Sequence, residues 1–359
     1  MYNNITRIYI SNDKEDGCER LRIEKVVEYA YNALIEVMSA NQGEKMVIVC
    51  DDSKEGIGEI FTKAGLKASL YTRMELLETK PNEYREKLSQ DIREIFSVKR
   101  PDLAINLLRG TSEETPFRIQ LINLETRNKD IRLGHGPGIT LDMLTDGALA
   151  LSIAAYKKMN SQADRVIAAT KGAQRIEVTT PKGTNVELSI QNREFFKDAT
   201  ITDEKWGNLP TGEVTVGPIE NSLKGVIVCD LAIGGVGLIE NNLKIISEEG
   251  KVKRLIGEGL PKTVLGKVKR ALSTDMMASV IGEMGIGLNP KARIMTEFLE
   301  SEKVYGTVHF AFGRNIDYPT GGENNSANHM DFLLSEPSVI AYFSDVDERE
   351  IIRDGQILV

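Results

Sequence analysis

The chain has 359 residues, of which 41% are hydrophobic and 6% are aromatic, and its formal net charge is −8. This length suggests two domains and allows a large core, and the composition excludes a disordered or fibrous protein. Because the charges are mixed along the chain and the balance is negative, we expect no nucleic-acid partner.

Targeting signals are not evident in the sequence. The first residues show no basic segment followed by an apolar one, and no apolar run reaches about 18 residues. We therefore expect a soluble, cytoplasmic protein with no membrane partner. The cysteines Cys18, Cys50 and Cys229 are too widely spaced for a disulfide framework, and Cys50 and Cys229 each end an apolar run. These two are expected to be buried strand thiols.

The first half of the chain alternates between helical and strand-like patterns. Apolar residues at helical spacing predict a helix over 21–40, and shorter helical patterns occupy 57–64 and 82–98. Apolar runs at 45–50, 66–71 and 103–108 predict strands, with a further short strand at 131–133. Strand–helix–strand order is typical of a parallel sheet with crossover helices. We predict an α/β N-terminal domain with an open parallel-type sheet over residues 1–165.

Two loops of this domain are candidate functional segments. Residues 51–58 follow the first strand but lack the glycine spacing that brings a backbone onto a pyrophosphate, which argues against nucleotide binding. The segment 134–138 is predicted as a turn, because its glycines allow positive φ and its proline fixes φ. His135 lies in that segment; a structural histidine is the more ordinary interpretation, and a site residue is the alternative.

The second half of the chain has a different hydrophobicity pattern, one typical of β-strands. Residues 175–180 and 185–190 alternate in hydrophobicity around a Pro-Lys-Gly turn, which predicts a β-hairpin. Strand-like runs continue at 225–231, 237–246 and 251–256. We predict an α+β C-terminal domain over 166–359, rich in antiparallel strands and carrying a metal site.

Histidines and carboxylates near the C-terminus are the candidate ligands. His329 and Asp331 are two apart, so in a strand they would face the same way and meet one ion. His309 stands in an apolar run, where a core histidine is the alternative. Glu213 follows a turn and Glu283 stands between glycines in apolar surroundings. A buried carboxylate needs a partner because an unpaired charge is costly, and an exposed loop glutamate is the alternative.

Several segments resemble, in the same order, those of the thermophilic-type metalloaminopeptidases, the aminopeptidase T and aminopeptidase S family. The segments are Pro210-Thr-Gly-Glu-Val with Gly217-Pro-Ile-Glu-Asn-Ser, Ile281-Gly-Glu-Met-Gly-Ile-Gly, Gly306-Thr-Val-His-Phe-Ala-Phe-Gly and Asn325-Ser-Ala-Asn-His-Met-Asp-Phe. The resemblance covers residues 205–335.

This resemblance implies a hydrolase with two divalent ions, cobalt, zinc, manganese or magnesium, held by Glu213, Glu283, His309, His329 and Asp331. The metal pair would activate a water for attack on a peptide substrate, with Glu283 as bridging ligand or base. Family members are dimeric, which implies a homodimer here.

The sequence departs from that family in two places. Where the family has an acidic run before the histidine, this chain has Lys303-Val-Tyr-Gly-Thr, with Glu300 and Glu302 as possible substitutes. Where the family has a tyrosine assigned to transition-state stabilisation, this chain has Ile316, and Tyr318 follows two residues later as the candidate catalytic group.

Three hypotheses remain open. The first, which we prefer from the sequence, is a metal-dependent aminopeptidase. The second is a ring-cleaving dioxygenase that uses one iron; a relative of that kind acts on dihydroxypyridine, keeps the final His-x-Asp, has a histidine in place of Glu283, and lacks counterparts of Glu213 and His309. Those three residues therefore favour the protease. The third is a noncatalytic metal-binding protein, which the departures at Lys303 and Ile316 suggest.

Overall fold

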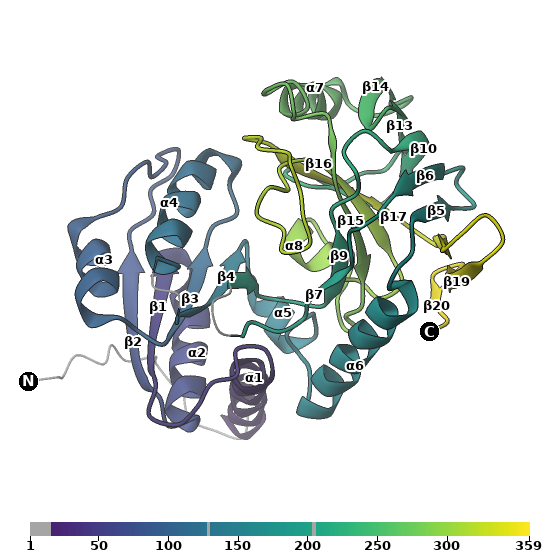
Figure 1. The fold of residues 1–359 in the computed structure, drawn as a ribbon. Helices are drawn as coiled ribbons and strands as arrows, with labels where there is room; N and C mark the ends of the chain where they lie inside the picture. The colour runs from purple at the N-terminus through teal and green to yellow at the C-terminus, as the bar shows by residue number, and fades with distance from the viewer. Residues whose placement is uncertain (1–15, 128–129, 203–205) are drawn as a thin grey trace, which may run out of the picture.

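The computed structural model describes residues 16–359 apart from 128–129 and 203–205. Figure 1 shows two lobes side by side, an N-terminal lobe with one sheet and a C-terminal lobe with two sheets. Helix α1 (Asp16–Glu36) contacts α5 (Leu141–Thr145) and α6 (Ile153–Thr170), so it joins the two lobes. Among the described residues, no helix is both long and apolar enough to span a bilayer.

The N-terminal sheet is parallel throughout, in the order β2-β1-β3-β4-β8. Its strands are β1 (Lys45–Asp51), β2 (Tyr71–Leu77), β3 (Leu103–Leu108), β4 (Arg132–Pro137) and β8 (Trp206–Asn208). The helices of this lobe besides α1 and α5 are α2 (Glu55–Lys67), α3 (Gln90–Glu94) with a π-helical turn at Ile95–Lys99, and α4 (Thr115–Glu125). The predicted α/β class with a parallel sheet is confirmed.

Burial on both faces explains why the first strand is a continuous apolar run. Met46, Ile48 and Cys50 of β1 join the larger hydrophobic core, whereas Val47 and Val49 face a second core on the other side. Parallel sheets covered by helices on both faces have this pattern. Cys50 is thus a buried strand thiol, as predicted, and so is Cys229.

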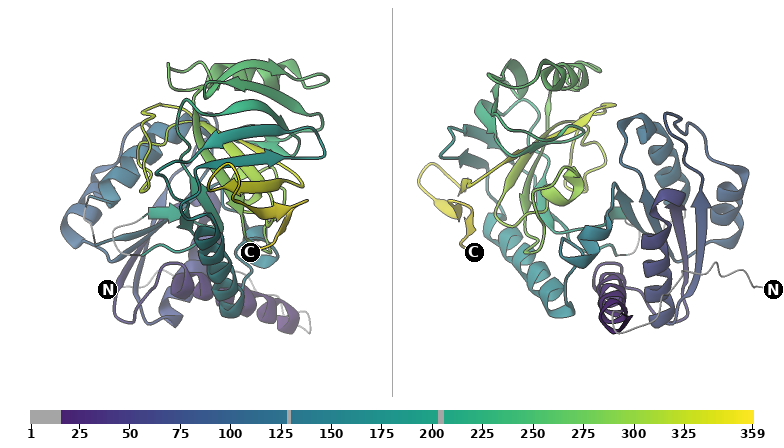
Figure 2. Two further views of the ribbon diagram at one scale, coloured as in Figure 1. Left: turned by 45° about the vertical axis from the view of Figure 1, so that its right-hand side comes forward. Right: turned by 180° about the vertical axis from the view of Figure 1, so that it is seen from behind.

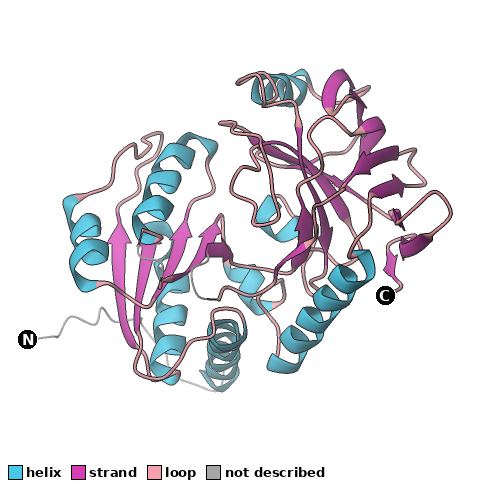
Figure 3. Cartoon of the chain, viewed as in Figure 1, coloured by secondary structure: helices cyan, strands magenta, loops and turns pink. Residues whose placement is uncertain are grey.

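The C-terminal lobe holds two antiparallel sheets (Figures 2 and 3). The eight-stranded sheet runs β14-β13-β10-β6-β5-β18-β19-β20 and the seven-stranded sheet runs β12-β11-β17-β16-β15-β9-β7. The strands of the first are β5 (Arg175–Thr179), β6 (Asn185–Ser189), β10 (Lys224–Cys229), β13 (Leu243–Glu248), β14 (Lys251–Ile256), β18 (Ser338–Tyr342), β19 (Glu348–Arg353) and β20 (Gln356–Ile357). The predicted hairpin is the β5–β6 pair, and the antiparallel character of this half is confirmed.

The strands of the seven-stranded sheet are short and closely paired. They are β7 (Phe196–Asp198), β9 (Glu213–Val216), β11 (Ala232–Ile233), β12 (Gly237–Leu238), β15 (Ile281–Gly287), β16 (Val308–Gly313) and β17 (His329–Leu334). Two more helices accompany the lobe, α7 (Lys262–Ala271) and α8 (Phe298–Ser301).

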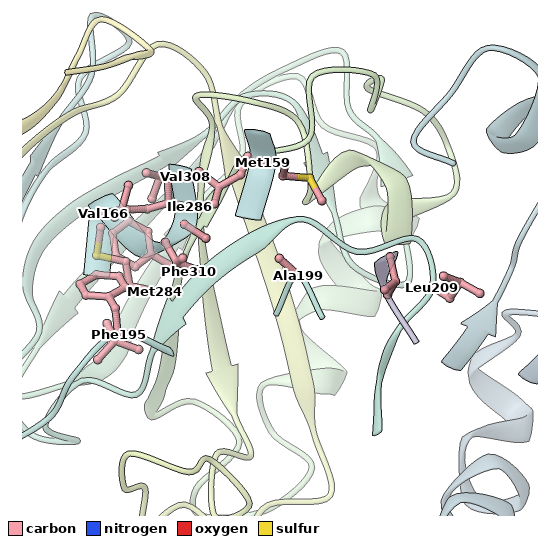
Figure 4. Close-up of a cluster of buried hydrophobic side chains, with 14 of the residues drawn as sticks. Met159, Val166, Phe195, Ala199, Leu209, Met284, Ile286, Val308 and Phe310 are labelled. Carbon is pink, nitrogen blue, oxygen red and sulfur yellow. The ribbon is translucent and has the colours of Figure 1, made fainter. Parts of the chain in front are cut away.

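One face of the seven-stranded sheet is apolar and packs toward α6. Figure 4 shows the buried side chains of this cluster, among them Met159 of α6 with Met284, Ile286 and Phe310 of β15 and β16. Because side chains alternate across a strand, the residues between these positions point to the opposite face. That opposite face is free to carry polar groups.

Two local predictions are wrong, and the helix predicted over 82–98 begins only at Gln90. The predicted strand at 66–71 is the end of α2 and a turn, and β2 begins at Tyr71. Leu66 belongs to α2 and is 62% exposed, so the apolar run at 66–71 spans the end of a helix and the start of a strand. The predicted turn at 134–138 is mostly β4. Gly136 is needed there because a Cβ would lie 2.9 Å from the Leu209 carbonyl oxygen, just after β8.

Candidate functional site

The five predicted ligands lie on one face of the seven-stranded sheet. Strands β17, β16, β15 and β9 run side by side, and they carry His329 with Asp331, His309, Glu283 and Glu213 in that order. The register pairs Ala311 with both Glu283 and Asp331, which brings the two carboxylates to either side of a methyl group. The structure therefore brings together residues that are more than a hundred positions apart.

Small residues between the polar ones make the convergence possible. Gly285 pairs with His309 across β15 and β16, and a Cβ at position 285 would lie 2.2 Å from the imidazole ring. Gly285 thus has a physical role, since it leaves the sheet face open for the imidazole ring of His309.

The ligand atoms fall into two groups that share Glu283. The buried group consists of Glu213, Glu283 and His309. The outer group consists of Glu283, His329 and Asp331. His309 Nε2 lies 3.4 Å from one Glu283 oxygen and 3.5 Å from Glu213. His329 Nε2 lies 3.2 Å from the other Glu283 oxygen and 3.5 Å from Asp331. With its side chain 36% exposed, His329 marks the side open to solvent.

The hydrogen bonding of His329 suits a metal ligand. Its Nδ1 lies 2.9 Å from the Arg314 carbonyl oxygen. A carbonyl only accepts, so Nδ1 carries the proton and donates. Nε2 is then directed at the carboxylates, and metal-bound imidazoles commonly have this second hydrogen bond to a backbone carbonyl.

Opposite charges shift the pKa values of the cluster strongly. Burial opposes the ionised form of Glu283, but hydrogen bonds from His309 and His329 hold its pKa well below the usual value. Burial likewise opposes the imidazolium of His309, but Glu283 and Glu213 raise its pKa to about 9. Asp331 and Glu283 hold the pKa of His329 well above its usual value against the effect of burial. Protons and a divalent cation would compete for the same carboxylates.

Two hydroxyl groups orient Glu283. Thr215 donates to one carboxylate oxygen at 2.5 Å, and Tyr318 donates to the other. The Tyr318 ring packs edge-on against Phe196, with centroids 5.2 Å apart. Ile316, the position aligned with the family tyrosine, is 43% exposed. Tyr318, two residues later in the same loop, is therefore the residue that reaches the cluster.

Lys303 is part of the cluster, although in the sequence it stands out only as a departure from a motif. Its side chain is fully buried, and its Nζ contacts Glu213, lies 2.9 Å from Glu302 and 3.6 Å from Asp198. Burial would lower the pKa of this ammonium, but Glu213 and Glu302 hold it well above the usual value. The replacement of an acidic residue by lysine was the signal that pointed to it.

The remaining candidates from the sequence, Glu300, Glu302 and His135, are not among the ligand atoms of the cluster. Glu302 reaches the cluster through Lys303, whereas Glu300 accepts a hydrogen bond from the Ala148 backbone at 3.0 Å. His135 is buried in β4, within 3.4 Å of Asn106 and edge-on to Trp206. Its contacts are those of a structural histidine in the N-terminal lobe.

Fold and site together define a two-lobed protein whose antiparallel lobe presents a cluster of carboxylates and imidazoles. A family model described as NicX, 2,5-dihydroxypyridine 5,6-dioxygenase, matches residues 146–359, which is more than half of the chain. The chain belongs to this family. No curated protein matches it.

Two solved structures share the fold. The 2,5-dihydroxypyridine dioxygenase from Pseudomonas putida KT2440 is 15% identical, with a TM-score of 0.62 over 92% of this chain and 96% of that chain. AmpT from Thermus thermophilus is 16% identical, with a TM-score of 0.69 over 94% of this chain and 100% of that chain. At such identities the likeness concerns the fold alone.

The identification as a metalloaminopeptidase is therefore wrong, and with it the assignment as a hydrolase or protease. The segments that carried the resemblance build the strands of a fold that AmpT and the dioxygenase both match over nearly the whole chain. Sequence motifs that form the strands of a fold indicate that fold. Proteins that share a fold can catalyse different reactions, so these motifs do not identify the reaction. Glu213, Glu283 and His309 were therefore not sufficient evidence against an oxygenase.

The expected pair of cobalt, zinc, manganese or magnesium ions is also wrong. The family to which the chain belongs is one of dioxygenases, whereas that pair of ions was expected for a peptidase. The structure adds a physical reason, because the Lys303 ammonium already stands against Glu213, a carboxylate that would have held one of the two ions.

Proposed function

We propose that the chain is a ring-cleaving dioxygenase that acts on a small dihydroxylated aromatic ring related to 2,5-dihydroxypyridine and uses one ferrous ion. Membership of the dioxygenase family supports the reaction class. The observation that carries the proposal in this chain is the outer group of Glu283, His329 and Asp331, whose ligand atoms lie within 4.8 Å of one another.

The donor set fits a divalent first-row ion. An imidazole nitrogen and two carboxylates on one face of the sheet would hold the ion, a donor set that resembles the facial triad of non-haem iron(II) oxygenases. That triad has two histidines and one carboxylate, and here Glu283 supplies a carboxylate at the third position. When bound, iron(II) would supply the activation of O₂ and of the ring hydroxyl.

The protein residues would hold this arrangement and orient its donors. Thr215 and Tyr318 fix both oxygens of Glu283, and Arg314 fixes the ring of His329 through its carbonyl. His329 lies at the exposed side, so the substrate would approach there. Outer hydrogen bonds of this kind typically change metal affinity or activity by about 10–100-fold when they are removed.

Other sequence-based expectations stay predictions. A direct metal-ligand role for Glu213 and His309 is one, and the homodimer is another. A small aromatic ring takes the place of a peptide as the substrate in this proposal. Cytoplasmic location and the expected lack of nucleic-acid or membrane partners are likewise predictions.

The test is ring cleavage by the iron-loaded protein. The full chain is loaded with Fe(II) without oxygen and then mixed with aerated 2,5-dihydroxypyridine, while the ring absorbance and dissolved O₂ are followed together. We expect one O₂ consumed per ring opened. Glu283→Gln should slow the reaction by about 100-fold, because the carboxylate is shared by both ligand groups. Glu240→Gln, at an exposed position, is the matched control.

Failure has two distinct forms. Metal binding at the cluster without O₂ uptake on any dihydroxypyridine, catechol or hydroquinone would favour the noncatalytic hypothesis. Ring cleavage that persists unchanged in Glu283→Gln would remove the proposed site and leave the family assignment standing.

A further inference from the structure

The buried half of the cluster already contains a cation. Lysine is almost never fully buried unless it is paired. Lys303 has no exposed side-chain surface, and three carboxylates, those of Asp198, Glu213 and Glu302, surround its Nζ. They come from β7, β9 and the segment after α8, so the ammonium ties three separate parts of the chain together.

The backbone around Lys303 is held independently of its charge. Its N–H donates to the Glu300 carbonyl at 3.1 Å, and its carbonyl accepts from the Asn289 N–H at 2.8 Å. A Cβ at Gly287 would lie 2.9 Å from the Lys303 carbonyl carbon, so this glycine lets the segment lie against the end of β15. The side chain therefore enters the cluster from a fixed position.

We propose that the Lys303 ammonium is the permanent cation of the buried half of the cluster, so that each chain binds one metal ion, held by Glu283, His329 and Asp331. The inference rests on the proposed function only in that an ion occupies the outer group. A second ion at Glu213, Glu283 and His309 would place a divalent cation and an ammonium on the same carboxylate in a buried region. Like charges at that distance repel strongly where water is excluded.

This assignment gives Glu213 and His309 different roles from those first predicted. Glu213 is the counter-ion of Lys303. His309 Nε2 lies between Glu213 and Glu283, at 3.5 and 3.4 Å, so an N–H there links the lysine half to the metal half. Lys303 then acts as a positioning residue, through Glu213 and His309, on the carboxylate that would hold the ion.

Metal stoichiometry tests the proposal directly. The full chain and Lys303→Met are equilibrated with excess Mn²⁺, freed of unbound metal, and analysed for ions per chain, with calorimetric titration as a second measure. We expect one ion in the wild type and two in Lys303→Met, because three buried carboxylates are then left for a cation. Added Mn²⁺ should also raise the melting temperature of the variant more than that of the wild type.

Lys197→Met is the matched control. It makes the same change in charge on the neighbouring strand β7, where Lys197 pairs with Asp164 at 2.8 Å outside the cluster. We expect it to bind one ion. A purely structural role for Lys303 predicts that Lys303→Met is less stable but still binds one ion, and that result would overturn the proposal.

Two further measurements keep the proposal testable if Lys303→Met does not fold. Two ions in the wild type would overturn it without any variant. Glu213→Gln should still bind one ion, with an affinity lowered by no more than the roughly 10–100-fold typical of a lost outer contact, whereas complete loss of metal binding would make Glu213 a ligand and overturn the proposal. One ion without ring cleavage would reject the proposed function and leave this inference intact; ring cleavage with two ions would do the reverse.

Discussion

Gly285 and His309 lie directly opposite each other on β15 and β16, and the imidazole occupies the space in which a side chain at 285 would stand. The ring therefore lies over Gly285, with Nε2 between Glu213 and Glu283. The absence of a side chain at Gly285 thus determines where the imidazole of His309 can lie.

Gly285→Ala should disturb the cluster more than an ordinary core substitution. The new methyl would meet the ring at 2.2 Å, so the imidazole or the strand must move. We expect a loss of about 1–3 kcal/mol in the free energy of unfolding, as for overpacked cores, together with weaker metal binding. Urea denaturation and metal titration measure the two effects.

Gly266→Ala is the control for that substitution. Gly266 lies inside α7, and a Cβ there would approach only the Arg270 side chain, at 3.4 Å. Alanine should leave metal binding unchanged and stabilise the helix by about 0.5–1 kcal/mol. Wild-type metal affinity in Gly285→Ala would show that the ring position is unimportant.

Tyr318→Phe should reduce activity while preserving the fold. The variant loses the hydroxyl that donates to Glu283 but keeps the ring against Phe196. We expect the rate of the iron-loaded enzyme and its metal affinity to fall by about tenfold, and the free energy of unfolding to change by about 1 kcal/mol. Tyr342→Phe is the matched control, because it removes a tyrosine–glutamate hydrogen bond of 2.8 Å to Glu177, away from the cluster. Equal losses in the two variants would count against a role for Tyr318 at the site.

A buried carboxyl group in the N-terminal lobe predicts a pH-dependent stability. Glu125 is fully buried and accepts a hydrogen bond from Asn106 at 2.8 Å. Burial raises the pKa of Glu125 to about 8, and burial lowers the pKa of His135, beside Asn106, to about 3. Above pH 6.5 His135 is neutral in the folded state and mostly neutral in the unfolded state, so Glu125 has the larger effect on the pH dependence of stability there.

The sign follows from the raised pKa. Between pH 6.5 and 8 the unfolded chain has an ionised Glu125 while the folded chain keeps the proton, so stability falls as pH rises. The fall is at most about 1.4 kcal/mol per pH unit, or about 2 kcal/mol over this window. Glu125→Gln should flatten the curve, and Glu86→Gln, at an exposed position, should not. Parallel curves for wild type and Glu125→Gln in urea denaturation would contradict the assignment.

Local patterns were sufficient where a segment has one environment along its length. The strands β1 and β3 are buried along almost their whole length because helices cover both faces of the sheet, and their mostly apolar runs predicted them. The spacing of His329 and Asp331 predicted a shared face because side chains alternate in any strand. The run at 66–71 misled because it spans the end of α2 and the start of β2, and hydrophobicity alone does not mark that change.

The sequence by itself determined the fold class, the strand-rich second half and the residues that could hold an ion. Only the tertiary structure decided which of them meet and what stands among them. The register of β9, β15 and β16 places Glu213 and Glu283 on either side of His309, and the segment after α8 inserts Lys303 against Glu213. The periodicity of a sequence indicates only which side chains are buried. The net charge of the cluster depends on residues from distant parts of the chain, and only the folded structure brings these together.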